Sequence, residues 1–253
     1  MPKATRGGRS ANNQNTGLRN YTAFSDQDAQ NLRDIQDSAY NGSVTAAVKM
    51  YISGQPGTPA ANVDGQGHSL SQTLNYLLEQ GYDVNNMTAA QVNQAIGVRI
   101  DGRTLASMQY SDAYMAAGAH AIGKDTLLTR AAHATVLQQE FGLSNWNNMT
   151  EAQLKARLVG ATTTNKAYLS TSYDASKSPF LSSSSGIAGG REVIYRIKTP
   201  SSTKVLLGNK AQAEVIIAKG QNMRITDAGF TGKTATPRLG GATRQIYVDI
   251  EIY

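Results

Sequence analysis

The chain has 253 residues, 40% of them hydrophobic and 17% charged, and its formal net charge is +6. This length and composition suit one large globular domain or two small ones, and they exclude a fibrous or wholly disordered protein. Because the chain has no cysteine, disulfides, cysteine-ligated metal sites and a thiol nucleophile are also excluded. No apolar run reaches the length of about 18 residues that a membrane-spanning helix needs, so no membrane contact is predicted.

The charge is distributed unevenly. Residues 1–20 carry four basic residues and no acidic one, residues 21–130 carry six basic and ten acidic residues, and residues 131–253 carry fourteen basic and eight acidic residues. We interpret residues 1–20 as a flexible basic tail, with contact to a nucleic acid or a partner as the alternative. No apolar segment follows its basic residues, so we expect no signal peptide and synthesis in the cytoplasm. The basic second half favours an anionic ligand, such as a dinucleotide, or a nucleic acid.

The first half has the pattern of successive helices. Ser25 is a good N-cap, and Asp28 in the following turn suits the positive end of the helix dipole. Ser69 and Gln72 form a capping-box pair in front of an apolar helical face. We therefore predict a helical subdomain at residues 21–124, with helices at 26–39, 44–52 and 69–80.

A short repeat marks two further helix starts. The sequence NNMTAAQ at residues 85–91 returns as NNMTEAQ at residues 147–153, and in both copies the Thr and the Gln have capping-box spacing. The sequences around the two copies do not match, so we predict two similar helix starts and not a duplicated domain.

The second half has the two-residue alternation of strands. Ile246, Val248, Ile250 and Ile252, for example, fall on one face of the last segment. Turn-forming pairs such as Gly208-Asn209 separate these segments. We predict strands at residues 191–199, 204–207, 214–218, 223–226 and 244–252. The fold class is therefore α+β: one domain at 21–253, whose helical subdomain precedes a β-rich core at 125–253, mainly an antiparallel sandwich.

Several common motifs are absent or incomplete. Residues 65–67, Gly-Gln-Gly, lack the third glycine and the preceding strand of a dinucleotide-binding turn. Neither a P-loop nor a nucleophile elbow occurs. The three histidines lack metal-ligand spacing, so no metal site is predicted.

Three short segments carry candidate chemistry. An apolar strand ends at Arg130, a Ser-Thr-Ser sequence occupies residues 170–172, and Gln212-Ala213-Glu214 opens another apolar strand. Each segment alone has an ordinary explanation. The arginine could be a surface charge, the Ser-Thr-Ser hydroxyls could satisfy a loop, and the glutamate could be a charge that prevents pairing at a sheet edge. Together, and in this order, they resemble the Arg–Ser–Glu class of mono-ADP-ribosyltransferases, which includes Rho-modifying exoenzymes, actin-modifying binary toxins and guanine-modifying toxins.

The resemblance covers residues 125–252 in detail and implies an ADP-ribosyltransferase core. It implies NAD as the co-substrate, release of nicotinamide, and transfer of ADP-ribose to a macromolecular acceptor, either protein or nucleic acid. It also implies a toxin or exoenzyme that is secreted or delivered to a target cell, with an inhibitor or antitoxin as a further partner. Two alternatives stay open: an NAD glycohydrolase, and a non-enzymatic structural or interaction protein of a phage or mobile element.

The resemblance also assigns residues. Cleavage between nicotinamide and ribose passes through an oxocarbenium-like transition state, which a carboxylate stabilises; Glu214 is the candidate. Arg130 would hold the phosphates, for which the planar guanidinium is well suited. Ser170 would form a hydrogen bond with the carboxylate or the nicotinamide ribose and so keep the site in its geometry. If residues 212–216 form a strand, Gln212 lies on the same face as Glu214 and would orient the nucleophile.

Further NAD contacts are expected next to these residues. The main-chain N–H of Ala131 would contact the nicotinamide. Thr171, the residue after Ser170, would also contact NAD. Residues 175–190 correspond to the family's phosphate–nicotinamide loop, in which Phe180 would stack on the nicotinamide ring and Lys177 or Arg191 would reach a phosphate. A solvated surface loop with one anchoring phenylalanine is the alternative.

Gln212 bears on the acceptor. Members that modify arginine usually carry Glu at this position, because a guanidinium with a pKa above about 12 needs a carboxylate partner to become nucleophilic. A neutral amide pairs instead with another amide or with a base edge. The resemblance implies that enzymes with Gln-x-Glu modify asparagine or guanine, so we predict a non-arginine acceptor, either an asparagine-type amide or a nucleobase. Residues 207–211 lack the aromatic residue that Rho-modifying members carry, which argues against Rho.

Overall fold

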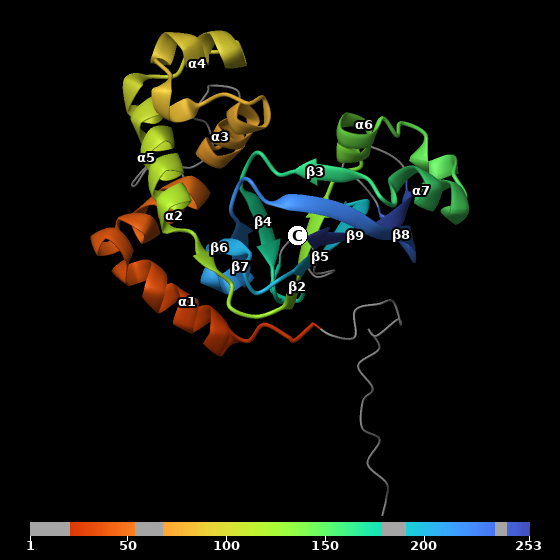
Figure 1. The fold of residues 1–253 in the computed structure, drawn as a ribbon. Helices are drawn as coiled ribbons and strands as arrows, with labels where there is room; N and C mark the ends of the chain where they lie inside the picture. The colour runs from red at the N-terminus through yellow and green to blue at the C-terminus, as the bar shows by residue number, and fades with distance from the viewer. Residues whose placement is uncertain (1–20, 54–67, 179–190, 236–241) are drawn as a thin grey trace, which may run out of the picture.

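A computed structural model describes residues 21–53, 68–178, 191–235 and 242–253 (Figure 1). Within these ranges, helices precede most of the strands, as predicted. The helices are α1 (Asp26–Ser38), α2 (Ser43–Ser53), α3 (Leu70–Glu79), α4 (Ala89–Ile96), α5 (Gly102–Gly118), α6 (Thr135–Phe141) and α7 (Glu151–Leu158). Short 3-10 helices follow α1 and precede α4, α7 and β7; they are η1 (Ala39–Gly42), η2 (Val84–Asn86), η3 (Trp146–Asn148) and η5 (Lys210–Gln212).

The strands of the described chain form one mixed, mostly antiparallel sheet. They are β1 (His120–Ala121), β2 (Thr126–Ala132), β3 (Thr162–Thr164), β4 (Leu169–Ser172), β5 (Val193–Thr199), β6 (Lys204–Leu207), β7 (Glu214–Ile217), β8 (Asn222–Ala235) and β9 (Thr243–Ile252). Their order is β1-β6-β7-β4-β2-β5-β9-β8-β3, and β5 and β9 are the parallel pair. The predicted α+β fold class is confirmed.

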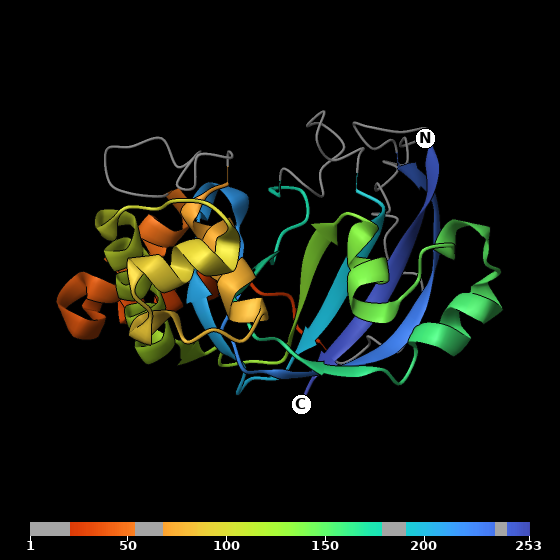
Figure 2. The same cartoon turned by 90° about the horizontal axis from the view of Figure 1, so that it is seen from above.

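Two apolar cores meet at strands β6 and β7. Leu206 and Ile216 point into a core shared with helices α2 to α5, which lie together at one end of the molecule (Figure 2). Their neighbours Leu207 and Val215 point the other way, into a core shared with β2, β5, β8 and β9. The two-residue period of a strand thus lets β6 and β7 serve both cores, which fixes the helices against the sheet.

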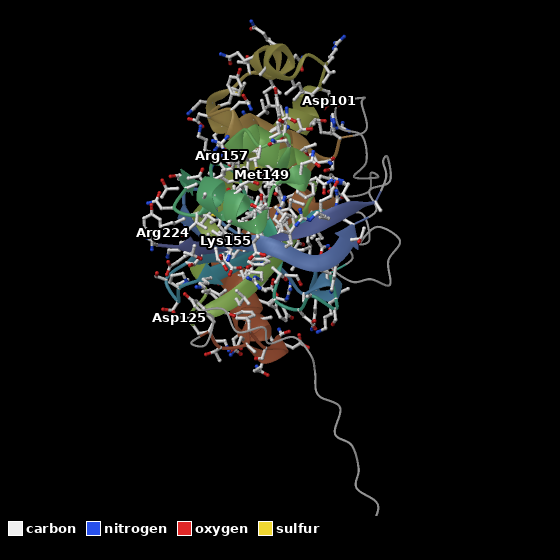
Figure 3. The ribbon with its side chains drawn as sticks, turned by 90° about the vertical axis from the view of Figure 1, so that its right-hand side faces the viewer. Asp101, Asp125, Met149, Lys155, Arg157 and Arg224 are labelled. Carbon is white, nitrogen blue, oxygen red and sulfur yellow. The ribbon has the colours of Figure 1, made fainter. Side chains whose placement is uncertain are left out.

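Helix α7 covers the part of the sheet that contains β8. Leu154 and Leu158 of α7 are buried in the sheet core, and Lys155 on the same helix pairs with Asp227 of β8 at 3.1 Å. Figure 3 shows this end of the molecule, with Lys155 and Arg157 on α7. This region lies away from helices α2 to α5 (Figure 2).

The repeated NNMT segments form the same local structure. Each makes a short 3-10 helix, η2 or η3, and then a capping box. The Gln91 side-chain oxygen accepts from the Thr88 N–H at 2.8 Å, and Gln153 accepts from Thr150 at the same distance. The prediction of two similar helix starts is confirmed.

Two features are absent from the described residues. None of their helices has both the length and the apolarity to cross a bilayer. No three or more of their acidic and histidine side chains converge in a way that could hold a metal ion.

Helix α1 begins with the predicted cap and is tied to the sheet. Asp28 accepts hydrogen bonds from the Ser25 N–H at 2.7 Å and from the ammonium of Lys124, which precedes β2. The Lys124 contact and then the Ser25 bonds lower the pKa of Asp28 from 3.8 to about 2. The folded state therefore favours the ionised carboxylate.

This shift predicts a specific loss of stability in acid. A carboxyl whose pKa is lower in the folded state stabilises the protein above its unfolded pKa, and that contribution disappears as the pH falls through the folded pKa. Between about pH 4 and pH 2, the unfolding free energy of the wild type should fall more steeply than that of Asp28→Asn. Urea titrations across this range measure both slopes. Parallel curves for the wild type and Asp28→Asn would contradict the assignment.

Candidate active site

A cavity lies where the sheet opens between β2 and β4. In the described chain these neighbours share a single register pair, Thr129 with Ser172, whereas β4 and β7 pair over four residues. The Arg130 guanidinium spans the opening and donates from Nη1 to the Ser170 carbonyl oxygen at 2.8 Å. The cavity has a volume of about 170 Å³ and is lined by Thr129, Arg130, Ala131, Ser170, Thr171, Ser172, Ser178, Arg191, Gln212 and Glu214.

The cavity brings together Arg130, Ala131, Ser170, Thr171, Gln212 and Glu214, all of them predicted site residues. Ser172 lies opposite Glu214 in the pairing of β4 with β7, and Ser170 lies opposite Ile216. Because directly opposed residues point to the same face of a sheet, the side chains of Ser170, Ser172 and Glu214 share one face. Thr171 points to the other face, where its hydroxyl donates to the Val215 carbonyl at 2.6 Å.

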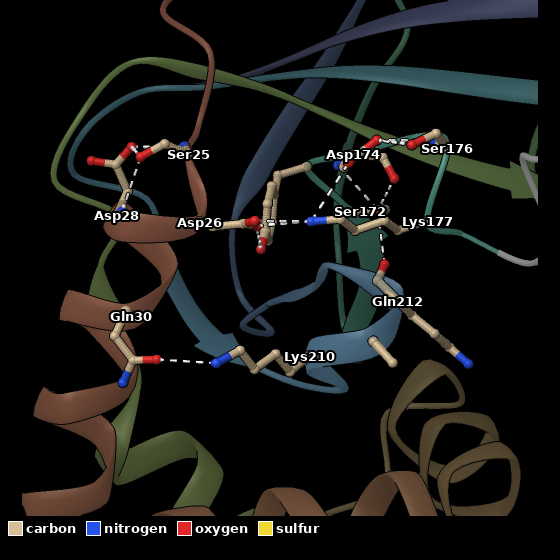
Figure 4. Close-up of polar contacts among 12 residues, drawn as sticks. Ser25, Asp26, Asp28, Gln30, Ser172, Asp174, Ser176, Lys177, Lys210 and Gln212 are labelled. Atoms are coloured by element: carbon tan, nitrogen blue, oxygen red, sulfur yellow. Dashed lines mark hydrogen bonds and ion pairs between the residues drawn. The ribbon is translucent and has the colours of Figure 1, made fainter.

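Gln212 is not on the strand of Glu214, so that prediction is wrong. It ends the 3-10 helix η5, and Ala213 has left-handed backbone angles (φ 49°, ψ 39°), so β7 begins at Glu214. The Gln212 carbonyl accepts from the Ser172 hydroxyl at 3.0 Å (Figure 4). A non-glycine residue rarely adopts this conformation, and no sequence signal marks it. Gln212 nevertheless lines the same cavity as Glu214.

A tight turn places Glu214. The Gly208 N–H donates to the Glu214 carbonyl and the Glu214 N–H donates to the Asn209 carbonyl, both at 3.1 Å, which closes residues 208–214 into a turn. The Asn209 N–H also donates to the Glu214 Oε2 at 2.8 Å. The carboxylate lies so close to Gly208 that a Cβ on this glycine would be 2.2 Å from Oε2. Glycine at 208 is therefore required for the observed carboxylate position.

Two guanidinium groups give the cavity its charge. Arg130 comes from β2, and Arg191 lies shortly before β5. Burial lowers the pKa of Arg191, and the nearby Arg130 acts in the same direction. Arginine keeps its proton in proteins, so the two side chains present two partly buried positive charges, together with hydroxyls and one carboxylate. This set suits an anionic ligand that has hydroxyl groups.

Sequence reasoning missed two helical residues near Ser170, the buried Tyr51 and the half-buried Asn75. The Asn75 side chain donates to the Tyr51 hydroxyl at 2.8 Å and to the Tyr168 carbonyl at 3.0 Å. Burial raises the pKa of Tyr51, while hydrogen bonds with Asn75 and Ser170 lower it. Tyr51 and Asn75 thus fix the start of β4 and the Ser170 hydroxyl. The helical pattern placed both residues on helices but could not show which strand they contact.

The three residues predicted to bind NAD from the phosphate–nicotinamide loop have different outcomes. Phe180 lies outside the described residues. Arg191 lines the cavity. The Lys177 ammonium is directed elsewhere, to both carboxylate oxygens of Asp26 on α1 at 3.0 Å (Figure 4).

Comparisons with known proteins agree with this architecture. The family model of the ADP-ribosyltransferase exoenzymes matches residues 63–248, well over half of the chain. Among solved structures, C3stau2 of S. aureus, solved with NAD, is similar with a TM-score of 0.56 and 14% identity, over 92% of this chain and 99% of that one. C3larvin of Paenibacillus larvae is similar with a TM-score of 0.54 and 12% identity, over 95% of this chain and 100% of that one.

The enzymatic component C2-I of the Clostridium botulinum C2 toxin is also similar, with a TM-score of 0.54 and 13% identity. The match covers 90% of this chain but 46% of C2-I, so this chain corresponds to less than half of that protein. At such identities the structural likeness establishes the shared fold. No curated protein matches the chain. Since the family match spans most of the sequence, the chain belongs to the ADP-ribosyltransferase exoenzyme family and is an NAD-dependent mono-ADP-ribosyltransferase.

Proposed function

We propose that this enzyme transfers ADP-ribose from NAD to a neutral nucleophile, an asparagine-type amide or a nucleobase, of a macromolecular acceptor. The observation that carries the proposal is one cavity that holds Glu214 together with Gln212, Arg130 and Arg191. The carboxylate supplies the chemistry that all transferases of this kind need. The neutral amide of Gln212, which lines the same cavity, sets the class of acceptor.

Binding rests on the two guanidinium groups. Arg130 and Arg191 hold the pyrophosphate, since the fork of a guanidinium matches two phosphate oxygens. The Ala131 main chain and Ser170 then adjoin the nicotinamide ribose. Thr171 acts through its place in β4, because its hydroxyl is already bonded to Val215. The C3stau2 structure was solved with NAD, which supports NAD as the ligand of this fold.

Catalysis rests on Glu214. As the bond between C1′ of the ribose and the nicotinamide nitrogen breaks, nicotinamide leaves as a neutral molecule with the bonding electrons, and positive charge develops on the ribose. The Glu214 carboxylate stabilises that charge and accepts a hydrogen bond from the ribose 2′-hydroxyl. The acceptor atom then bonds to C1′ and loses its proton to the solvent.

Gln212 selects the acceptor. Its amide donates one hydrogen bond and accepts another, which suits a second amide or a base edge. It carries no negative charge to help deprotonate a guanidinium. The surplus of fourteen basic over eight acidic residues in 131–253 favours a nucleic acid over a protein as the macromolecule.

The first test uses NAD labelled in its adenylate part and a total cell extract. We expect label to enter macromolecules and to be erased by nuclease. Erasure by protease with an asparagine-linked product supports the amide alternative. An arginine-linked product contradicts the proposal. Nicotinamide release without any labelled macromolecule would identify an NAD glycohydrolase.

The second test concerns Glu214. Glu214→Ala removes an interaction made mainly in the transition state, so kcat should fall by about 100- to 1000-fold while the NAD dissociation constant changes little. Nicotinamide release and calorimetry measure the two quantities. Glu251→Gln, on β9, is the matched control and should retain activity. Substantial turnover in Glu214→Ala would refute the assignment.

The third test concerns Gly208. Gly208→Ala pushes the flexible end of Glu214 away, so kcat should fall by about tenfold or more at an unchanged melting temperature. Gly102→Ala is the control, because a Cβ at Gly102 meets no atom within 4 Å. Equal kcat values for the two variants would show that the carboxylate position does not matter.

A further inference from the structure

Helix α1 takes the place of a missing strand at the edge of β6. Strand β1 pairs with β6 at Lys204 and Val205 alone, so the outer edge of Leu207 has no strand partner in the described sheet. The buried Gln36 side chain fills that position. Its Nε2 donates to the Leu207 carbonyl at 3.1 Å, and its Oε1 accepts from the Leu207 N–H at 2.8 Å. One amide thus satisfies both main-chain groups, as a neighbouring strand would.

The contact continues into the 208–214 turn. The Arg33 Nη2 donates to the Gly208 carbonyl at 3.2 Å. The next residue is Asn209, whose N–H holds the Glu214 carboxylate. Lys210, further along the turn, lies 3.4 Å from the side-chain oxygen of Gln30 on the same helix (Figure 4).

The same helix also holds the segment that follows β4. The Tyr173 hydroxyl donates to Asp26 at 2.7 Å, and the Lys177 ammonium contacts both oxygens of that carboxylate. Helix α1 therefore contacts two segments that lead to the cavity: the 208–214 turn and residues 173–177. It lies before residue 63, where the family match begins.

We propose that Gln36 and Arg33 are positioning residues that hold the 208–214 turn and thereby set the place of the Glu214 carboxylate. This inference rests on the proposed role of Glu214. Gly208 and Asn209 lie beyond the end of β6, and among the described residues the other bonds to this turn are those within it and those from Ser172 and Tyr173 to its far end. The side that faces α1 is therefore held by Gln36 and Arg33. A misplacement of about 1 Å at a reacting group can cost about 100-fold in rate, so a small shift of this turn is enough to be measured.

The test uses Gln36→Met and Arg33→Met. Methionine keeps the length of the side chain but removes its hydrogen bonds to residues 207 and 208. We expect kcat for nicotinamide release to fall about tenfold, with the KM for NAD within about twofold of wild type, because Arg130 and Arg191 lie on other segments. Calorimetry should still give one NAD bound per chain, which excludes a loss of folded protein.

Two controls complete the design. Gln27→Met makes the same chemical change on the same helix, where Gln27 contacts Asn31, and should leave kcat unchanged. Arg33→Lys keeps a charged donor near Gly208 and should recover most of the activity that Arg33→Met loses. If Gln36→Met does not fold, the Arg33 pair decides the question.

Three results would overturn the inference: an unchanged kcat in the folded variants, a change confined to KM, or a loss in Arg33→Lys equal to that in Arg33→Met. The assay follows nicotinamide release with water as the acceptor of ADP-ribose, so it is independent of which macromolecule is modified. If Glu214→Ala is fully active, the proposed function has failed; if Glu214→Ala is inactive and Gln36→Met and Arg33→Met are normal, only the positioning role has failed.

Discussion

The hydrogen bond from Arg130 to the Ser170 carbonyl spans the place where the sheet opens, and the rest of the site is arranged around it. Strands that pair along their whole length leave no space for a ligand. Here β2 and β4 meet at one register pair and then diverge, and a cationic side chain occupies the gap. A group that holds the two strands in place also presents charge to a ligand between them.

Glu214 depends on a second local arrangement. The carboxylate is held by the Asn209 N–H, lies against Gly208, and follows a left-handed Ala213 that turns the chain into β7. These features belong to a turn that lies past the end of β6, and none of the described strands lies on its outer side. Helix α1 supplies that side through Gln36 and Arg33. The outer helix and the catalytic carboxylate are thus parts of one structure.

Much of the fold was predictable because it depends on local pattern. The capping boxes at Thr88 and Thr150 and the alternation of apolar residues along β5 and β9 are patterns that can be read within a few consecutive residues. Helix α5 was not predicted, since its buried face includes the polar residues Ser107, Ser111 and Asp112. The placement of Gln212 failed because one residue in an uncommon conformation interrupts the strand period.

The residues that form the site could be predicted from the sequence, but the residues that hold them in place could not. Arg130, the Ser170 segment and Glu214 stand at recognisable positions along the chain. Gln36, in contrast, pairs with a residue 171 positions away, and Asn75 contacts a strand that begins after residue 168. A helical pattern shows that such residues lie near an apolar face, but the partner depends on how the helices pack on the sheet.

The most direct test is a crystal structure of the Glu214→Gln variant with NAD, in which slow turnover preserves the dinucleotide. We expect the pyrophosphate on the Arg130 guanidinium and the nicotinamide ribose beside residue 214, in the same molecule. A dinucleotide bound outside the cavity, or one that reaches Arg130 but not residue 214, would contradict the account.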